Sequence, residues 1–270
     1  MKTIGRWLIL FMIFAILLFP IWMMVSNSFS PIRGFMRSPP TLLPTTFTLD
    51  NYRQLLSMKE LPRWILNTCI LAAILVPGGV IITGAAGYAF SFSSSRWIRR
   101  LFWVFMVPIF VSGYVLLIPK MRIIGMVGLH SLPAVVSMSL FWSTGMFLFR
   151  NYFRTIPKEI VESSRIDGAG EWRVLLQVVL PMSRPMIGAA IVFLGMGVLG
   201  DYIWQMLNLL AKDTQTYLVG LMASTINVSV VKNVGYDLTV GTMLFIPYLV
   251  LFSVSSRYFI KGLTAGALKA

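Results

Sequence analysis

Residues 162–181 read Glu-Ser-Ser-Arg-Ile-Asp-Gly-Ala-Gly-Glu-Trp-Arg-Val-Leu-Leu-Gln-Val-Val-Leu-Pro, a polar stretch that separates two long apolar runs of the chain. A short helix is predicted over 157–166, because its first residue is a proline, which suits the first turn of a helix. Small residues at 167–170 predict a turn, and a second helix is expected over 171–180, ended by Pro181. The apolar residues of the second helix share one face at helical spacing. They are Val174, Leu175, Val178 and Val179. The stretch therefore predicts a helix–turn–helix bracket with one apolar face.

The composition of the whole chain indicates a membrane protein. Of the 270 residues, 57% are hydrophobic and 12% are charged, whereas soluble domains carry about 25% charged residues. The mean hydropathy is +0.80. These values exclude a soluble enzyme, a disordered protein and a secreted domain stapled by disulfides. The predicted fold class is an all-α integral membrane protein that crosses the cell (inner) membrane several times, with spans of about 20 residues each.

Six apolar runs predict six transmembrane helices, because the runs are solidly apolar and lack the alternation of a β-barrel. They cover residues 7–25, 64–95, 101–119, 132–149, 185–210 and 238–256. The first run is longer than the core of about 7–15 residues found in secretory signals, so we expect it to be retained. The predicted organisation is a first transmembrane helix in 1–29, an extracytoplasmic loop in 30–63, a five-helix core in 64–258 with a cytoplasmic loop at 150–184, and a cytoplasmic tail in 259–270.

The connecting segments are expected to be polar loops, and their charges predict the orientation. An arginine cluster at 96–100 ends the second run, a short loop with Lys120 and Arg122 follows the third, and a polar loop covers 211–237. With six spans and the N-terminus inside, 14 of the 23 Lys and Arg residues fall on the inner side. Basic residues collect in cytoplasmic loops, so both termini are predicted to be cytoplasmic.

The bracket also resembles a known motif. Glu162-Ser-Ser, followed by Gly168 and then by Leu180-Pro181, is similar in residues and spacing to the EAA loop of permease subunits of binding-protein-dependent ABC importers. The flanking segments Ile156-Pro157-x-Glu159 and Ile166-Asp167-Gly168-Ala169 resemble the carbohydrate, maltose-type branch of these permeases.

The resemblance extends over nearly the whole chain and has two departures. Matching segments outside the bracket are Asn51-Tyr52, Asn67-Thr68 and residues 257–269. The first departure is the pair Ser163 and Ser164, where the family usually has two alanines. The second is Gly200-Asp201-Tyr202, where it often has Trp-Asn-Asp, and this departure affects the expected lining of the pathway.

The resemblance implies a type I ABC importer permease fold, in which the bracket is a coupling helix that sits in a cleft on an ATPase subunit. The residues implied in coupling are Glu159, Glu162, Ser163, Ser164, Asp167, Gly168, Ala169, Leu180 and Pro181. Glu162 is expected to pair with a basic group of the ATPase, and Gly168 to permit close approach of backbones. Asp167 is expected to cap the turn or the second helix. The alternative is an ordinary amphipathic loop helix.

The fifth run is expected to line the transport pathway, because it continues directly from the bracket. Asp201 and Gln205 lie four residues apart, on one helical face, and Asn208 lies three residues further. These side chains suit sugar hydroxyls, and Trp204 beside them could stack on a sugar ring. The alternative is that these residues mark the outer interface of the membrane, where tryptophan is enriched.

The chain lacks the residues for catalysis or for holding a cofactor. It contains no Gly-x-x-x-x-Gly-Lys-Ser/Thr phosphate loop, and Cys69 and His130 are its only cysteine and histidine. We therefore predict no catalytic residue, no metal site and no cofactor in this chain, with ATP and Mg²⁺ bound by separate ATPase subunits. The net charge of +14 is assigned to membrane orientation rather than to nucleic acid.

The predicted function is a transporter subunit rather than an enzyme. The implied partners are a second permease subunit (as a heterodimer), two ATPase subunits, an extracytoplasmic solute-binding protein and the lipid bilayer. The predicted substrate is a sugar or oligosaccharide, including an acidic one. Three alternatives stay open at the level of sequence: a permease for another solute such as glycerol phosphate, a membrane-embedded enzyme, and an ion-driven carrier.

Overall fold

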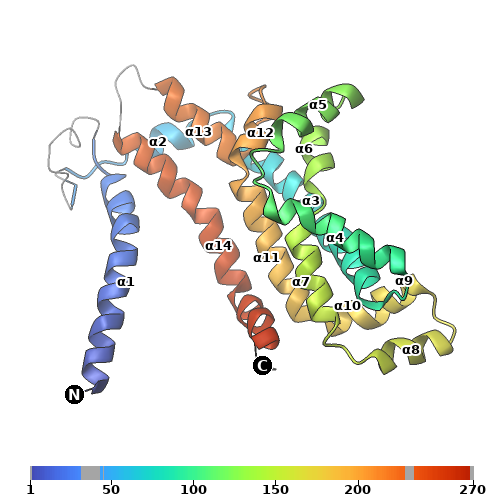
Figure 1. Cartoon of the computed structure of the whole chain (residues 1–270). Helices are drawn as coiled ribbons and strands as arrows, with labels where there is room; N and C mark the ends of the chain where they lie inside the picture. Colours follow the sequence, from blue (N-terminus) through green and yellow to red (C-terminus); the bar gives the residue numbers. More distant parts are fainter. Residues whose placement is uncertain (1, 32–42, 45, 229–233, 268–270) are drawn as a thin grey trace. The chain divides into compact units, whose positions relative to one another are not determined.

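The computed structural model describes residues 2–31, 43–44, 46–228 and 234–267, and it describes side chains over 5–31, 43–44, 46–226 and 234–255. The regular elements in this part of the chain are all helices (Figure 1). They are α1 (Lys2–Asn27), α2 (Asp50–Leu56), α3 (Leu61–Phe92), α4 (Arg96–Phe110), α5 (Leu117–Val127), α6 (Ser131–Ser139), α7 (Ser143–Phe153), α8 (Lys158–Ile166), α9 (Glu171–Val174), a π-helical turn (Leu175–Val179), α10 (Leu180–Met182), α11 (Arg184–Gly200), α12 (Tyr202–Asn208), α13 (Tyr217–Val228) and α14 (Val234–Ala267). The chain divides into two compact units, Met1–Ile65 with Thr216–Tyr248, and Leu66–Gln215 with Leu249–Ala270.

Several of these helices are long and apolar enough to cross a bilayer. Among the described residues there are four helical stretches of this kind, one of which is made of α6 and α7, and a bent pair of helices would make a fifth span. The four are Gly5–Asn27, Leu61–Phe92, Ser131–Phe153 and Val234–Ser255, and the pair is Glu171–Met182 with Arg184–Gly200, bent by 88°. They correspond to five of the six predicted runs, so the prediction of a helical, multi-pass membrane protein is confirmed.

The third predicted run is not a single helix. We expected one span over 101–119, but α4 ends at Phe110 and a separate helix, α5, begins at Leu117. The arginines at 96–100, expected to lie in a loop, form the first turns of α4, since arginine is a good helix former. Lys120 and Arg122, also expected in a loop, lie on α5, whose first turn accommodates Pro119.

Two further predictions of extent were wrong. The fifth span was expected to reach 210, but α11 ends at Gly200 and α12 begins after a break at Asp201. The expected polar loop at 211–237 contains α13, an apolar helix. The cytoplasmic tail at 259–270 stays a prediction, and α14 continues into it as far as Ala267. Residues 32–42 and 45 of the predicted 30–63 loop lie outside the described residues, and the short surface helix expected there is α2.

The first unit packs around a small aromatic cluster. Its buried residues come from α2, α3, α13 and α14 and are Leu55, Leu61, Trp64, Tyr217, Leu221, Tyr236 and Val240. The Trp64 ring lies against Gly220, where a Cβ atom would come within 2.2 Å of it. The buried Asn51 amide donates to the carbonyl oxygens of Ser28 (3.2 Å) and Ser30 (3.0 Å), which ties α2 to the end of α1.

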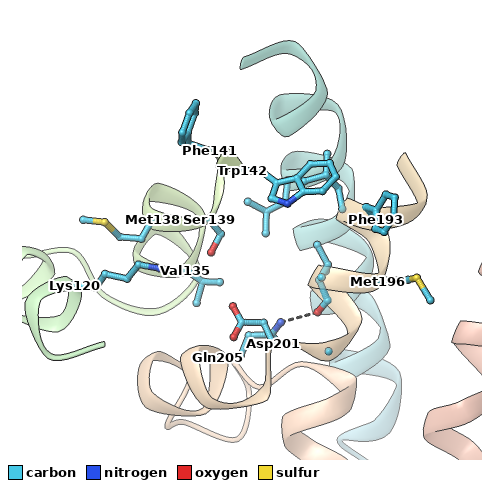
Figure 2. Close-up of a pocket in the computed structure, with 15 residues that line it drawn as sticks. Lys120, Val135, Met138, Ser139, Phe141, Trp142, Phe193, Met196, Asp201 and Gln205 are labelled. Carbon is cyan, nitrogen blue, oxygen red and sulfur yellow. Dashed lines mark hydrogen bonds between the residues drawn. The ribbon is translucent and has the colours of Figure 1, made fainter. Parts of the chain in front are cut away.

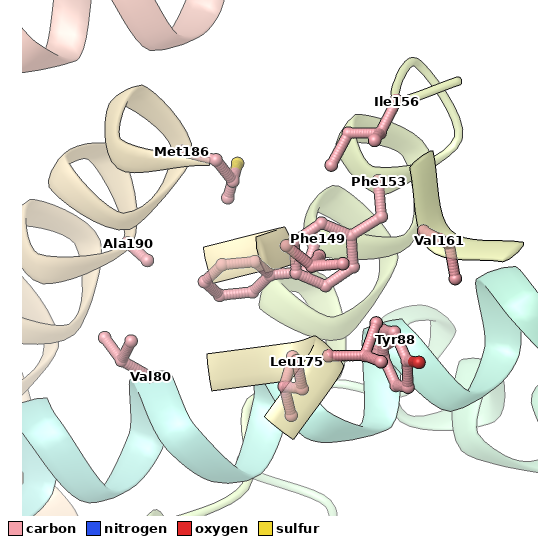
Figure 3. Close-up of a cluster of buried hydrophobic side chains, with 11 residues drawn as sticks. Val80, Tyr88, Phe149, Phe153, Ile156, Val161, Leu175, Met186 and Ala190 are labelled. Atoms are coloured by element: carbon pink, nitrogen blue, oxygen red, sulfur yellow. The ribbon is translucent and has the colours of Figure 1, made fainter. Parts of the chain in front are cut away.

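The second unit holds the bracket, which is packed on the membrane helices by a continuous apolar cluster. Figure 3 shows this cluster, to which α3, α7, α8 and α11 all contribute. Val161 of α8 is 1% exposed, and the α3–α7 crossing is close, since a Cβ atom at Gly87 would lie 2.7 Å from Phe149 Cβ. The bracket is therefore part of the folded unit rather than a loop on its surface.

Candidate functional site

The bracket has the architecture that its sequence predicts, with one difference at its end. Helix α8, the turn at 167–170 and helix α9 follow in order. Pro181 does not end the second helix; it lies inside α10, and the bend comes at Ser183. Ser183 is fully buried, and its hydroxyl donates to the carbonyl oxygen of Val179 at 2.8 Å. A serine bonded to its own helix in this way favours bending, and here the helix axis turns by 88° into α11.

The turn between the two helices requires glycine at position 168. Gly168 has φ +82°, its N–H donates to the carbonyl oxygen of Arg165 at 3.0 Å, and the Ala169 N–H donates to that of Ser164 at 3.1 Å. This pair of bonds is the Schellman motif, which ends a helix through a left-handed residue. Of the two positions considered for Asp167, it stands at the turn, as the C-cap residue of α8, and Gly170 occupies the N-cap position of α9.

The two faces of the bracket differ in polarity. Buried Val161, Val174 and Val179 attach it to the apolar cluster, and Ala169 and Leu180 pack against the same cluster. The opposite face is exposed and includes Glu159, Glu162, Ser163, Asp167, Gly168 and Pro181. Helix α8 and the turn therefore present three carboxylates to solvent, while the buried residues hold the bracket against the apolar cluster.

The two serines that replace the family's alanines are accommodated by local hydrogen bonds. The hydroxyls of Ser163 and Ser164 donate to the carbonyl oxygen of Ile160 at 3.1 and 2.8 Å. Since each hydroxyl finds a partner within its own helix, α8 keeps its shape with serine in place of alanine.

A cluster of three polar residues, which the sequence reasoning missed, joins the bracket to α3. Arg165 Nε lies 2.9 Å from Glu171 Oε1, Arg165 Nη2 donates to Glu171 Oε2 at 3.0 Å, and the Tyr88 hydroxyl donates to that same Oε2 at 2.5 Å. The bond to Glu171 raises the pKa of Arg165, and the bonds from Arg165 and then Tyr88 lower the pKa of Glu171. The opposite charges of Arg165 and Glu171 on the two sides of the turn could have predicted the ion pair. The sequence around Tyr88 gives no indication that its hydroxyl bonds to Glu171.

A cavity of about 460 Å³ is lined by α3, α6, α11, α12 and the first turn of α5, with walls of two kinds (Figure 2). Phe141, Trp142 and Phe193 form an aromatic wall, and Lys120, Asp201 and Gln205 form a polar one. The Trp142 ring rests on Gly145, where a Cβ atom would lie 2.0 Å from the indole. Asp201 and Gln205 were predicted to line a pathway; Lys120 and Trp142 were missed because they were assigned to a loop and to an apolar run.

The other predicted pathway residues have structural contacts. Trp204 is 3% exposed, packs in a second apolar cluster and is not among the residues that line the larger cavity. Its ring does border a smaller cavity of about 240 Å³ beside Lys120 and Asp201. Gln205 donates to the carbonyl oxygen of Val198 at 2.7 Å, and Asn208 donates to that of Trp204 at 2.8 Å. Asp201 is the N-cap residue of α12, which carries Gln205 and Asn208; Asp201 and Gln205 both line the larger cavity, and Asn208 is not among its lining residues.

The described part of the chain shows no arrangement suited to a metal. Over the residues that the structure describes, no three His, Cys, Asp or Glu side chains lie close enough to hold an ion. The candidate functional sites are thus the exposed face of the bracket and the amphipathic cavity.

Comparison with known proteins identifies the class. Residues 75–265 match the family described as "Binding-protein-dependent transport system inner membrane component". This match covers well over half of the chain, so the chain belongs to that family and is a multi-pass membrane protein. A chain of a bacterial ABC transporter involved in the import of the acidic polysaccharide alginate has the same fold, with a TM-score of 0.81, 21% identity and 96% of each chain covered.

The similarity to individual relatives extends over nearly the full length of both proteins. The chain is 27% identical to the arabinooligosaccharides transport system permease protein AraQ of Halalkalibacterium halodurans, over 94% of this chain and 92% of that protein. It is 29% identical to the galactooligosaccharides transport system permease protein GanQ of Bacillus subtilis, over 99% and 96%. It is 30% identical to the sn-glycerol-3-phosphate transport system permease protein UgpE of Rhizobium meliloti, over 92% and 91%.

Proposed function

We propose that this chain is a permease subunit of an ATP-driven importer for a sugar or oligosaccharide. The observation that carries the proposal is its family membership, together with similarity along nearly the whole chain to permeases named for arabino- and galactooligosaccharides. The cavity agrees with such a substrate, because aromatic rings stack on sugar faces while the opposite polar wall offers hydrogen bonds to hydroxyls.

We propose six spans with both termini in the cytoplasm. Helix α4 would form the sixth, which is not among the five candidates found by length and composition. A helix of 15 residues rises about 22 Å, less than the hydrocarbon thickness of about 30 Å. The non-helical residues after it would complete the crossing, and such backbone is tolerated where it lines a cavity. Gly113 and Tyr114 line the smaller cavity, which supports this assignment. The bias of basic residues supports the orientation.

The exposed face of α8 is the proposed docking surface for the ATPase. Glu159, Glu162 and Asp167 are free of ion pairs among the described residues and face solvent, so a basic cleft on a partner would complement them. The proposed complex contains a second, different permease subunit, two ATPase subunits that bind ATP and Mg²⁺, and an extracytoplasmic solute-binding protein. This chain transmits movement, and the chemistry of hydrolysis belongs to its partners.

The charges of the cavity favour a neutral substrate. Lys120 and Asp201 both line it, so one cation and one anion face the same space. The alternative is an anionic solute such as glycerol phosphate, which Lys120 and the similarity to UgpE favour. The Asp201 carboxylate opposes it, because Asp201 already balances the charge of Lys120 and would repel a second anion in the same space.

Reconstitution with a panel of substrates tests the proposal. The chain is purified with its partner subunits, placed in proteoliposomes with the binding protein, and supplied with labelled neutral oligosaccharides, uronate oligosaccharides or glycerol 3-phosphate. We expect uptake of a neutral oligosaccharide only when ATP is supplied on the side of the bilayer where the ATPase subunits lie. Uptake of glycerol 3-phosphate alone would replace the carbohydrate assignment, and uptake without ATP would remove the importer assignment.

A further inference from the structure

We propose that Glu171 is a positioning residue for energy coupling, which holds α8 in register with both helices that lead to the cavity. This inference rests on the proposed function, since it concerns how movement of the docked bracket reaches the pathway. Its structural basis is the cluster of Tyr88, Arg165 and Glu171, called the Glu171 cluster below.

The geometry of the Glu171 cluster joins three separate elements through one carboxylate. Arg165, in the last turn of α8, contacts both oxygens of Glu171, at 2.9 and 3.0 Å. Glu171 is the first residue of α9, and the Tyr88 hydroxyl of α3 donates to it at 2.5 Å. A two-point contact between arginine and carboxylate fixes direction as well as distance. Removal of this carboxylate would detach α9 from the cluster and leave the longer bond from Arg165 Nη2 to the Tyr88 hydroxyl, at 3.5 Å, between α8 and α3.

Besides the Glu171 cluster, backbone hydrogen bonds and the packing of Ala169 hold the turn between α8 and α9. A Cβ atom placed at Gly168 or Gly170 would meet no atom within 4 Å, so no side chain packs on either glycine. The Arg165–Glu171 pair spans this turn from one helix to the next. Its side chains are 34% and 60% exposed, and ion pairs so exposed contribute little to stability. The role of the pair is therefore to fix the orientation of α8 relative to α9 rather than to add stability.

Both helices that the carboxylate joins to α8 continue to the cavity. Helix α9 leads through the bend at Ser183 into α11, where Met196 and Gly197 line the cavity. Helix α3 carries Tyr88, and on the same helix Leu75 lines the cavity. When the Glu171 cluster is intact, a displacement of α8 therefore moves the α11 and α3 walls of the cavity together. Without the cluster, the apolar contacts alone transmit the displacement.

The test compares substrate transported per ATP hydrolysed in the reconstituted importer, at equal amounts of co-purified ATPase. Glu171→Gln and Arg165→Gln should each lower this ratio by roughly fivefold or more, the lower range of measured coupling between sites. The double variant should be no worse than either single variant, because both remove the same connection. Tyr88→Phe should show a smaller loss, and it serves as the test if Glu171→Gln assembles poorly.

The matched control is Arg53→Gln, which removes the arginine of an exposed ion pair with Asp50 on α2 and should leave the ratio unchanged. A normal ratio in both Glu171→Gln and Arg165→Gln would overturn the inference, and so would losses that multiply in the double variant. A wild-type chain that carries no ATPase, or drives no ATP-dependent uptake, would instead overturn the proposed function.

Discussion

At the scale of single residues, Gly168 combines a backbone requirement with a place on the docking face. Its φ of +82° costs about 1–2 kcal/mol for an ordinary residue, and a β-branched side chain adapts to it least well. We predict that Gly168→Val lowers transport and stimulated ATPase activity, while the external binding protein keeps its affinity for the solute.

The companion variant is Gly168→Asn, because asparagine is similar in volume to valine yet tolerates the left-handed conformation. If the backbone conformation is what matters within this chain, Asn retains most of the coupled activity that Val loses. If a partner backbone must approach closely, both variants lose it. Normal transport in a well-assembled Gly168→Val variant would contradict the coupling role of this turn.

Asp201 offers a second test at the same scale. It lines the cavity opposite the aromatic wall, and its side chain is exposed. Asp201→Asn should preserve assembly and change the transport rate or the preference between neutral and anionic solutes. Asp213→Asn is the control, because that carboxylate is exposed and lines neither of the two cavities described above. Identical uptake of the whole panel by the wild type and Asp201→Asn would remove this residue from the pathway.

Residue-level prediction from sequence succeeded where the local chain decides conformation. The turn at 167–170 follows from its small residues, and the buried face of the second helix follows from the spacing of its apolar residues. The partners of Trp204 and Gln205 could not be predicted, because Val198 belongs to another helix and the second apolar cluster forms only after folding. The role of Tyr88 was hidden for the same reason, since Glu171 lies 83 residues away.

At the scale of elements, the crossing of α3 and α7 sets how the bracket is held. A Cβ atom at Gly87 would lie 2.7 Å from Phe149 Cβ and 3.1 Å from the backbone nitrogen of Arg150. The backbone cannot move aside as a flexible side chain can, so Gly87→Ala should destabilise the protein by about 1–3 kcal/mol. Thermal unfolding in detergent would show this as a lower midpoint.

A glycine one turn away on the same helix supplies the control. At Gly84 the nearest atom to a new Cβ would be Leu180 Cδ2 at 3.8 Å, an ordinary contact. Gly84→Ala should therefore be neutral or slightly stabilising, by up to about 1 kcal/mol, because alanine is the better helix former. Equal midpoints for Gly84→Ala and Gly87→Ala would show that the close crossing does not limit stability.

Long apolar helices could be predicted from the sequence, whereas short helices and breaks could not. The runs at 7–25, 64–95 and 238–256 correspond to α1, α3 and α14, because a long apolar segment has few alternatives to a helix. The breaks at 111–116 and at Asp201 were not predicted, since apolar residues continue on both sides and hydropathy carries no signal of a bend. Helix α13 was missed because the residues flanking it are polar.

At the scale of the whole molecule, the orientation of the chain in the membrane is open to direct measurement. After Cys69→Ala, single cysteines are introduced at exposed positions and tested with an impermeant thiol reagent on intact cells. Cysteines at Thr46 and Asp213 should react, and cysteines at Arg99 and Ser163 should not, because the last two lie on the proposed cytoplasmic side. Labelling at Ser163 in intact cells would reverse the proposed orientation.

The central claim is that this permease works only as part of an ATP-driven importer, and the most direct measurement is ATP hydrolysis by the complex purified through this chain. The complex should contain an ATPase subunit, and the liganded binding protein should raise its hydrolysis rate at constant protein concentration. A well-folded chain that purifies without any ATP-hydrolysing subunit, or a complex whose hydrolysis ignores the binding protein, would contradict the claim.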